Sequence, residues 1–149
     1  MALSKITNGG VATSGMPSES IIQVKEGSAT TEVAHQAAWE DTGLSVSITP
    51  TSTSSKILII VNQQCYRTGA GGGALRILRD STTVFQDAQV YQSYGNELSN
   101  RHFHNMQYID SPSTTSAIIY KTQAYEHSGD WRTQQGGLES RIIVMEIAG

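Results

Sequence analysis

The chain of 149 residues is 38% hydrophobic and only 15% charged, with a formal net charge of -3. This length suits one domain with a core of its own, while the lack of a lysine and arginine cluster argues against nucleic-acid binding. The single cysteine, Cys65, excludes an intrachain disulfide, and the sequence offers no apolar run of the length of a membrane span or signal peptide. We therefore expect synthesis and assembly in a reducing cytosol.

Residues 1 to about 20 are rich in serine, threonine, glycine and asparagine and show no apolar periodicity. Such a segment buries too little surface to order itself, so it indicates either an arm that orders on docking or a leader without a role. A period of two begins at 21–24. We place the arm at residues 1–28 and a single domain at 29–149, and expect the arm to add a strand to a partner protein through Ile21, Ile22 and Val24.

The next elements in the chain are short strands. Residues 30–34 are one candidate, although 34–40 could form a helical turn instead. Leu44, Val46 and Ile48 then alternate with small polar residues, which is the pattern of a half-buried strand. A proline at position 50 ends it.

Two later strands, 57–61 and 141–147, are apolar on both faces. One face of each strand can fill the core of a sandwich. The other face needs cover, because a large aliphatic side chain left in water forfeits about 1.5 to 3 kcal/mol. Either a second sheet or a neighbouring subunit supplies that cover, and two such strands in a small domain favour a subunit contact. The expected contact residues are Leu58, Ile60, Ile143 and Met145.

The remaining segments read as hairpins and loops. Turn residues separate the candidate strands 74–79, 82–86, 101–110 and 116–126. The expected loops are the glycine-rich 69–73, the tyrosine-containing 91–100 and the segment 127–137. Because strands recur without a long amphipathic helix, the sequence predicts an all-β fold, namely an antiparallel β-sandwich or jelly roll.

Three segments resemble structural proteins of tailed bacteriophages, especially marine ones. They are WEDTGLSVSITPTSTSSKILIIV at 39–61, DSPSTTSAIIYK at 110–121 and IIVMEIAG at 142–149. These strings are patterns of strand and turn, so they point to architecture more than to a ligand.

The resemblance implies a tail-fibre or capsid-decoration protein with a jelly-roll body similar to the tumour-necrosis-factor and complement globular heads, generally a homotrimer. An arm of 28 residues is short for a tail fibre, which leaves fibre, capsid knob and tail-tip accessory open. The protein is then expected in the virion, assembled in the host cytoplasm, with itself and a second virion protein as partners.

Aromatic and amide side chains in the expected loops suggest a second role. An aromatic face beside amide groups is typical of sugar recognition and of protein interfaces, so the alternative function is a carbohydrate-binding module for a host-surface glycan. The opposing interpretation is that Trp131 and Tyr125 cap the open end of the sandwich. The candidate ligand-binding residues are Tyr91, Tyr94, Asn96, Trp131 and Gln134.

The pair His102 and His104 projects from one face of its expected strand, with the two side chains about 6 to 7 Å apart. Three such pairs around a trimer axis could supply six imidazoles to a transition metal. A single pair without neighbouring cysteine or carboxylate spacing is a weak metal motif, and the default is a pair of surface histidines.

The sequence gives little sign of catalysis. Glu139 with Glu146, or Asp41 with Asp110, could act as acid and base in glycoside hydrolysis, but acids are scattered through any chain. Cys65 ends an apolar strand, where a cysteine is typically a small core residue. We expect a non-enzymatic protein without a cofactor.

Overall fold

The computed structural model describes residues 17–87 and 99–149, with the backbone alone at 69–71. The expected ligand residues Tyr91, Tyr94 and Asn96 lie outside these ranges. The elements are β1 (Ile21–Ala29), β2 (Val33–Ala34), β3 (Glu40–Ile48), β4 (Lys56–Arg79), β5 (Thr82–Gln86), β6 (Asn100–Asp110), β7 (Ile118–Thr133), the 3-10 turn η2 (Gln135–Gly137) and β8 (Ser140–Ile147).

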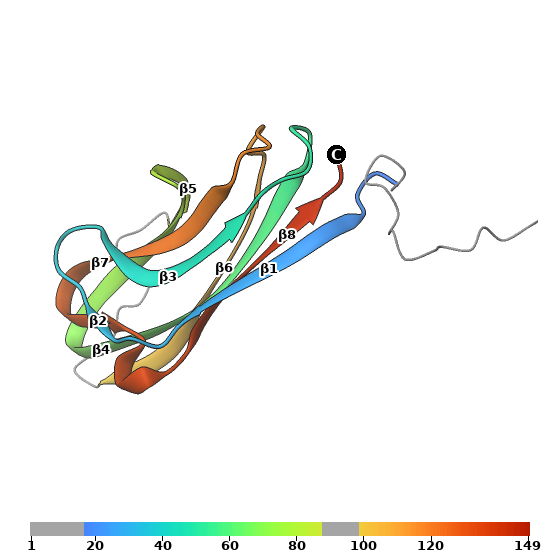
Figure 1. Ribbon diagram of the computed structural model, residues 1–149. Helices are drawn as coiled ribbons and strands as arrows, with labels where there is room; N and C mark the ends of the chain where they lie inside the picture. The colour runs from blue at the N-terminus through green and yellow to red at the C-terminus, as the bar shows by residue number, and fades with distance from the viewer. Residues whose placement is uncertain (1–16, 88–98) are drawn as a thin grey trace, which may run out of the picture.

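All strand pairs are antiparallel and form two layers (Figure 1). The first sheet has the order β1-β8-β4-β6 and uses the first half of β4. The second sheet has the order β3-β7-β4-β5 and uses the second half of β4. The pairs β1 with β8, β3 with β7, and β4 with both β6 and β5 are nested along the chain, as in a jelly roll. The expected all-β sandwich is confirmed.

The core lies between the two sheets because each strand turns alternate side chains inward. In β3, Leu44, Val46 and Ile48 are buried and the residues between them are exposed, so the predicted half-buried strand is confirmed. The first sheet contributes Ile57, Ile59, Val61, Met106, Ile142 and Val144, and the second adds Leu75, Ile77, Ile118 and Tyr120.

The glycine-rich segment 69–73 is not a loop, as the sequence suggested, but part of the 24-residue strand β4. Its register against β7 shifts around Gly72, where β4 passes from one sheet to the other. A Cβ atom on Gly73 would lie 2.6 Å from the carbonyl oxygen of Tyr125 and 2.7 Å from the ring of Trp131. Gly73 therefore permits the close approach of β4 and β7. Glycine within a strand often marks such a close approach of two backbones.

One other expectation about local structure was wrong, and of the two alternatives for residues 30–40 the strand is found, at Val33–Ala34. Residues 127–133, read as a loop, continue strand β7 and pair with β4. No helical turn forms between β2 and β3, where residues 35–39 are irregular. The strand at 127–133 depends on its pairing with β4, which lies far away in the sequence.

The segment assigned to the arm also enters the sheet. Strand β1 pairs with β8 from Ile21 to Ala29, and residues 19 and 20 bond to the backbone of Ala148. A Cβ atom on Gly27 would lie 2.0 Å from the carbonyl oxygen of Ser45 in β3, so β1 closes one side of the sandwich. In the structure the sandwich therefore begins near residue 19, inside the stretch that the sequence assigned to the arm.

Buried carboxylates join the strands at one end of the sandwich. Glu146 accepts hydrogen bonds of 2.7 Å from the backbone and hydroxyl of Thr51 and from Ser55, and one of 2.6 Å from Gln23. Burial opposes its charge, but these hydrogen bonds outweigh that effect and hold the pKa of Glu146 below its usual value. Asp110 likewise accepts hydrogen bonds of 2.6 Å from Arg79 and Tyr120. Two of the four acids that the sequence offered for catalysis, Glu146 and Asp110, thus hold elements together.

Candidate subunit interface

The outer face of the first sheet carries a row of aliphatic side chains across all four strands. Val24 of β1 stands opposite Met145 of β8, which stands opposite Leu58 of β4, which stands opposite Ile109 of β6. These residues alternate with the core residues of their strands and must point away from the core. Val24 is 52% exposed and Ile109 is 54% exposed. The second sheet covers the inner face only, so this row faces outward.

Two neighbouring rows extend this apolar surface. Ile143 of β8 stands opposite Ile60 of β4, and on the other side of the first row Ile21 stands opposite Ile147. Ile21 is 55% exposed, and Ile60, Ile143 and Ile147 are partly exposed. We call the set the apolar face: Ile21, Val24, Leu58, Ile60, Ile109, Ile143, Met145 and Ile147.

Strands about 4.8 Å apart and side-chain rows about 6.7 Å apart give the apolar face an area of roughly 300 to 400 Å². A contiguous exposed patch of this size on a soluble chain commonly marks an interaction site. The apolar face is therefore large enough to serve as the subunit contact that the two-sided strands predict.

Polar residues limit the apolar face toward the other end of the sheet. The next outward row consists of Ser28, Arg141, Asn62 and Asn105. The amide of Asn62 donates a hydrogen bond of 2.6 Å to Asn105, and Arg141 bonds to Glu139 at 3.0 Å. A polar boundary around an apolar centre is the usual anatomy of a protein interface.

A hollow of about 380 Å³ lies at the foot of the apolar face. Its walls include Ile109 and Ile147 from the face, Lys56 beside them, and the last two residues, Ala148 and Gly149. The chain enters the sheet here, since Ser18 and Glu19 complete the wall. A neighbouring side chain could fill this hollow without displacing any strand.

All four contact residues expected from the sequence, Leu58, Ile60, Ile143 and Met145, lie side by side on the apolar face. Two of the expected attachment residues, Ile21 and Val24, lie on it too, while Ile22 occupies an irregularity in the pairing of β1. Ile109 and Ile147 were not among the expected contact residues, although the period of two places Ile147 on the same side of its strand as Ile143 and Met145. The same period through Met106 and Tyr108 places Ile109 on the opposite side of its strand from them.

The histidine pair lies on one face of β6, as expected, but on the inner face. His102 and His104 alternate with exposed residues and share the side of buried Met106. The ring of His102 lies 5.6 Å from that of Trp131, and His104 lies 3.2 Å from Asp87. Burial, followed by nearby His104 and Arg67, lowers the pKa of His102. Because the pair points away from the apolar face, it cannot meet its copies around an axis through that face.

Within the described ranges, no three histidine, cysteine, aspartate or glutamate side chains gather as metal ligands would. Cys65 is buried, and burial, with a smaller contribution from Asp87, raises the pKa of its thiol. It packs in the core as a small apolar residue. Over the same ranges, the structure has no helix of the length and apolarity needed to cross a membrane.

Trp131 and Gln134 do not present a ligand surface, because Trp131 is 1% exposed and Gln134 is 0% exposed. Trp131 belongs to the core, in agreement with the interpretation that it caps the end of the sandwich. Gln134 forms a hydrogen bond of 2.9 Å with Ser140. The expectation that these two side chains bind a ligand is therefore wrong for this conformation.

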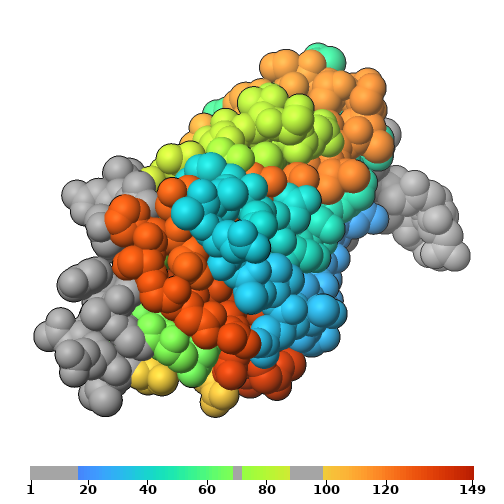
Figure 2. Space-filling model, turned by 90° about the vertical axis from the view of Figure 1, so that its left-hand side faces the viewer, coloured from blue at the N-terminus to red at the C-terminus, as the bar shows by residue number. Residues whose placement is uncertain are grey.

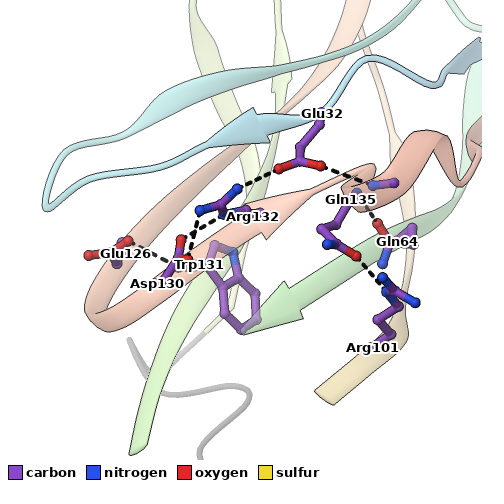
Figure 3. Close-up of polar contacts among 9 residues, drawn as sticks. Glu32, Gln64, Arg101, Glu126, Asp130, Trp131, Arg132 and Gln135 are labelled. Carbon is purple, nitrogen blue, oxygen red and sulfur yellow. Dashed lines mark hydrogen bonds and ion pairs between the residues drawn. The ribbon is translucent and has the colours of Figure 1, made fainter. Parts of the chain in front are cut away.

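Polar contacts hold the segment around Trp131 and η2 in place (Figure 3). Arg132 bonds to Asp130 and to Glu32 of the segment before β2, at 2.8 and 2.7 Å. These hydrogen bonds raise the pKa of Arg132 and lower that of Glu32. The backbone of Gln135 donates to Gln64 at 2.7 Å. These hydrogen bonds and ion pairs connect the described segments at this end of the sandwich to one another.

No family model matches the chain, and no curated protein matches it. Three solved structures show what it is similar to. The Eiger TNF from S. frugiperda is 14% identical with a TM-score of 0.43, over 87% of this chain and 94% of that one. A mutant VP2 protein of infectious bursal disease virus in T=1 particles is 15% identical with a TM-score of 0.45, over 99% of this chain and 41% of that one.

The infectious bursal disease virus Gx strain gives 16% identity and a TM-score of 0.44, over 87% of this chain and 34% of the virus chain. This chain therefore spans less than half of either virus chain. The fold assignment rests on the nested strand pairs.

Proposed function

We propose that this protein is a non-enzymatic structural component of a tailed-bacteriophage particle, which assembles with copies of itself through the apolar face. The observation that carries the self-association is the aliphatic row Val24, Met145, Leu58 and Ile109, which crosses all four strands of the first sheet. The phage context rests on the resemblance of residues 39–61, 110–121 and 142–149 to phage structural proteins.

The energetics favour association. Each large aliphatic side chain moved from water into an apolar contact gains about 1.5 to 3 kcal/mol when fully buried, and the face carries eight such residues. Part of this gain is offset by the lost freedom of the associating copies. A closed oligomer removes the patch from water in every subunit, and the resemblance favours three subunits.

Two exposed isoleucines on opposite sides of the molecule allow a matched test. Ile109 on the apolar face is 54% exposed, and Ile119 on the outer face of the second sheet is 47% exposed. We expect light scattering after size exclusion to show a trimer for the parent chain and for Ile119→Asp, and a monomer for Ile109→Asp. A parent monomer at micromolar concentration, or equal behaviour of the two variants, would contradict the proposed interface.

In the particle, residues 1–16 attach the oligomer to a second virion protein while the sandwich projects outward as a fibre tip or knob. Among the described strands, β1 pairs with β8 alone, and this pairing uses one of its two edges. Part of its other edge could therefore accept a strand of the partner protein. Deletion of residues 2–16 keeps every described strand and should leave the oligomer intact, yet prevent its incorporation into particles. Normal incorporation, seen by labelling intact virions, would show that the attachment lies elsewhere.

A further inference from the structure

The outer face of the second sheet carries aromatic and charged side chains from three strands. Trp39, immediately before β3, lies with its ring 5.6 Å from that of Tyr125 on β7. The guanidinium of Arg76 on β4 lies 4.5 Å from the centre of the Trp39 ring. Both aromatic residues are partly exposed. Figure 2 shows the start of β3 and the segment before it lying beside β7 on this side of the molecule.

A chain of hydrogen bonds continues from these rings along the sheet. Arg76 donates through Nε to the side-chain oxygen of Gln123 at 2.9 Å. Gln123 donates to one oxygen of Asp41 at 2.7 Å, and Lys121 donates to the other oxygen at 2.8 Å. Partial burial disfavours the charge of Asp41, but the bonds from Lys121 and Gln123 outweigh it and hold its pKa below the usual value.

Within residues 17–87 and 99–149, Arg76 interacts with the Trp39 ring and through space with Asp41, but no carboxylate bonds to its guanidinium. Its Nε and Nη2 both donate to the neutral amide of Gln123, and it forms no ion pair with the described side chains. A guanidinium has five N–H donors, so three remain for another acceptor. A carboxylate is the acceptor that matches its planar fork.

A small hollow adjoins this strip where β3 leaves its register with β7. Between Asp41 and Ser45 the pairing shifts, so that β3 carries more residues than the opposing stretch of β7. The hollow, about 140 Å³, is lined by Asp41 and Lys121 at its polar side and by Leu44 and Ile119 at its apolar side. It can hold one substituent of a larger ligand, since whole-ligand pockets are usually several hundred Å³.

We propose that Trp39, Tyr125, Arg76, Gln123, Asp41 and Lys121 form a binding site for an acidic saccharide, a chain of pyranose units that carry carboxylates. The partly exposed rings offer apolar surface for a pyranose. Asp41 accepts hydrogen bonds from sugar hydroxyls, Gln123 and Lys121 donate to them, and Arg76 binds the carboxylate. This mixture of donors and acceptors beside aromatic rings suits a polyhydroxylated ligand better than an extended peptide.

The site does not depend on the particle role proposed above. It lies on the opposite side of the molecule from the apolar face, and self-association through that face would leave it open to solvent. In an oligomer, each subunit would present one copy, and several weak sites would act together on one polysaccharide.

The two tryptophans provide a direct measurement. Trp131 is 1% exposed whereas Trp39 is partly exposed, so a collisional quencher such as iodide acts mainly on Trp39. We expect a tetramer of β-1,4-linked mannuronate to protect this fluorescence at concentrations where neutral cellotetraose and a hexaglutamate peptide do not. Equal protection by cellotetraose or by the peptide would overturn the assignment to acidic saccharides, and no protection by any of the three would overturn the site.

Two arginine variants then locate the contact. Arg76→Gln should weaken tetramannuronate binding about tenfold or more, because it removes a charge-assisted contact. Arg101→Gln is the matched control, since Arg101 also stacks on an aromatic ring, that of Tyr66 at 5.7 Å, but on the first sheet. Equal affinity of Arg76→Gln and the parent chain, with both folded by circular dichroism, would refute the site.

Discussion

His35 makes the stability of this protein depend on pH. Its side chain is 0% exposed, and Nε2 shares a hydrogen bond of 2.9 Å with the hydroxyl of Thr133. Burial lowers its pKa from 6.5 to about 4, against a weaker opposing effect of Glu40. Between these two values the unfolded chain binds a proton that the folded chain does not, so the free energy of unfolding falls as the pH falls.

The magnitude follows from the two pKa values. Each unit of difference corresponds to about 1.36 kcal/mol, so the full effect is roughly 3 kcal/mol, reached near pH 4. By pH 5, where most carboxylates remain charged, the loss relative to pH 7.5 should be about 2 kcal/mol. The pKa of His102 is also lowered by burial, and its contribution has the same sign.

Urea denaturation at pH 7.5, 6 and 5 measures this effect, with His35→Asn as the comparison. The variant retains a polar side chain that does not titrate, so its stability should fall less steeply over this interval. His102 is present in both chains and its contribution cancels in the difference. Parallel pH profiles of the parent and the variant would show that His35 is protonated equally in the folded and unfolded states, and would refute the argument.

Three further substitutions test the packing. Gly27→Ala should lower the free energy of unfolding by about 2 kcal/mol or more in thermal or urea denaturation, because its Cβ would lie 2.0 Å from a β3 carbonyl oxygen; unchanged stability would show that β1 can move aside. Gly73→Ala should cost a similar amount and shift the fluorescence of Trp131, whose ring would lie 2.7 Å from the added Cβ, whereas an unaltered spectrum would contradict this contact. Glu146→Gln should cost about 1 to 3 kcal/mol at pH 7, since an amide cannot accept all four hydrogen bonds that the carboxylate accepts; a parent-like urea midpoint would count against that role.

Local patterns in the sequence predicted the all-β fold and most of its strands. The alternation through Leu44, Val46 and Ile48 and the two-sided strands at 57–61 and 141–147 reflect a backbone period of two that no tertiary contact needs to supply. This period also placed Leu58 and Ile60 opposite the core. Four of the eight residues of the apolar face, Leu58, Ile60, Ile143 and Met145, therefore follow from the amino-acid sequence alone.

Long-range pairing decided the rest. Whether 69–73 and 127–133 are loops or strands depends on the partner strand, because that strand supplies the hydrogen bonds. The glycines of 69–73 permit both conformations. The surroundings of single side chains also depend on this pairing. The fold places Trp131 in the core. It brings together Trp39, Arg76 and Tyr125 on the second sheet, although they lie far apart in the sequence. A sequence fixes the faces of its own strands, whereas contacts between strands exist only once the two sheets have formed.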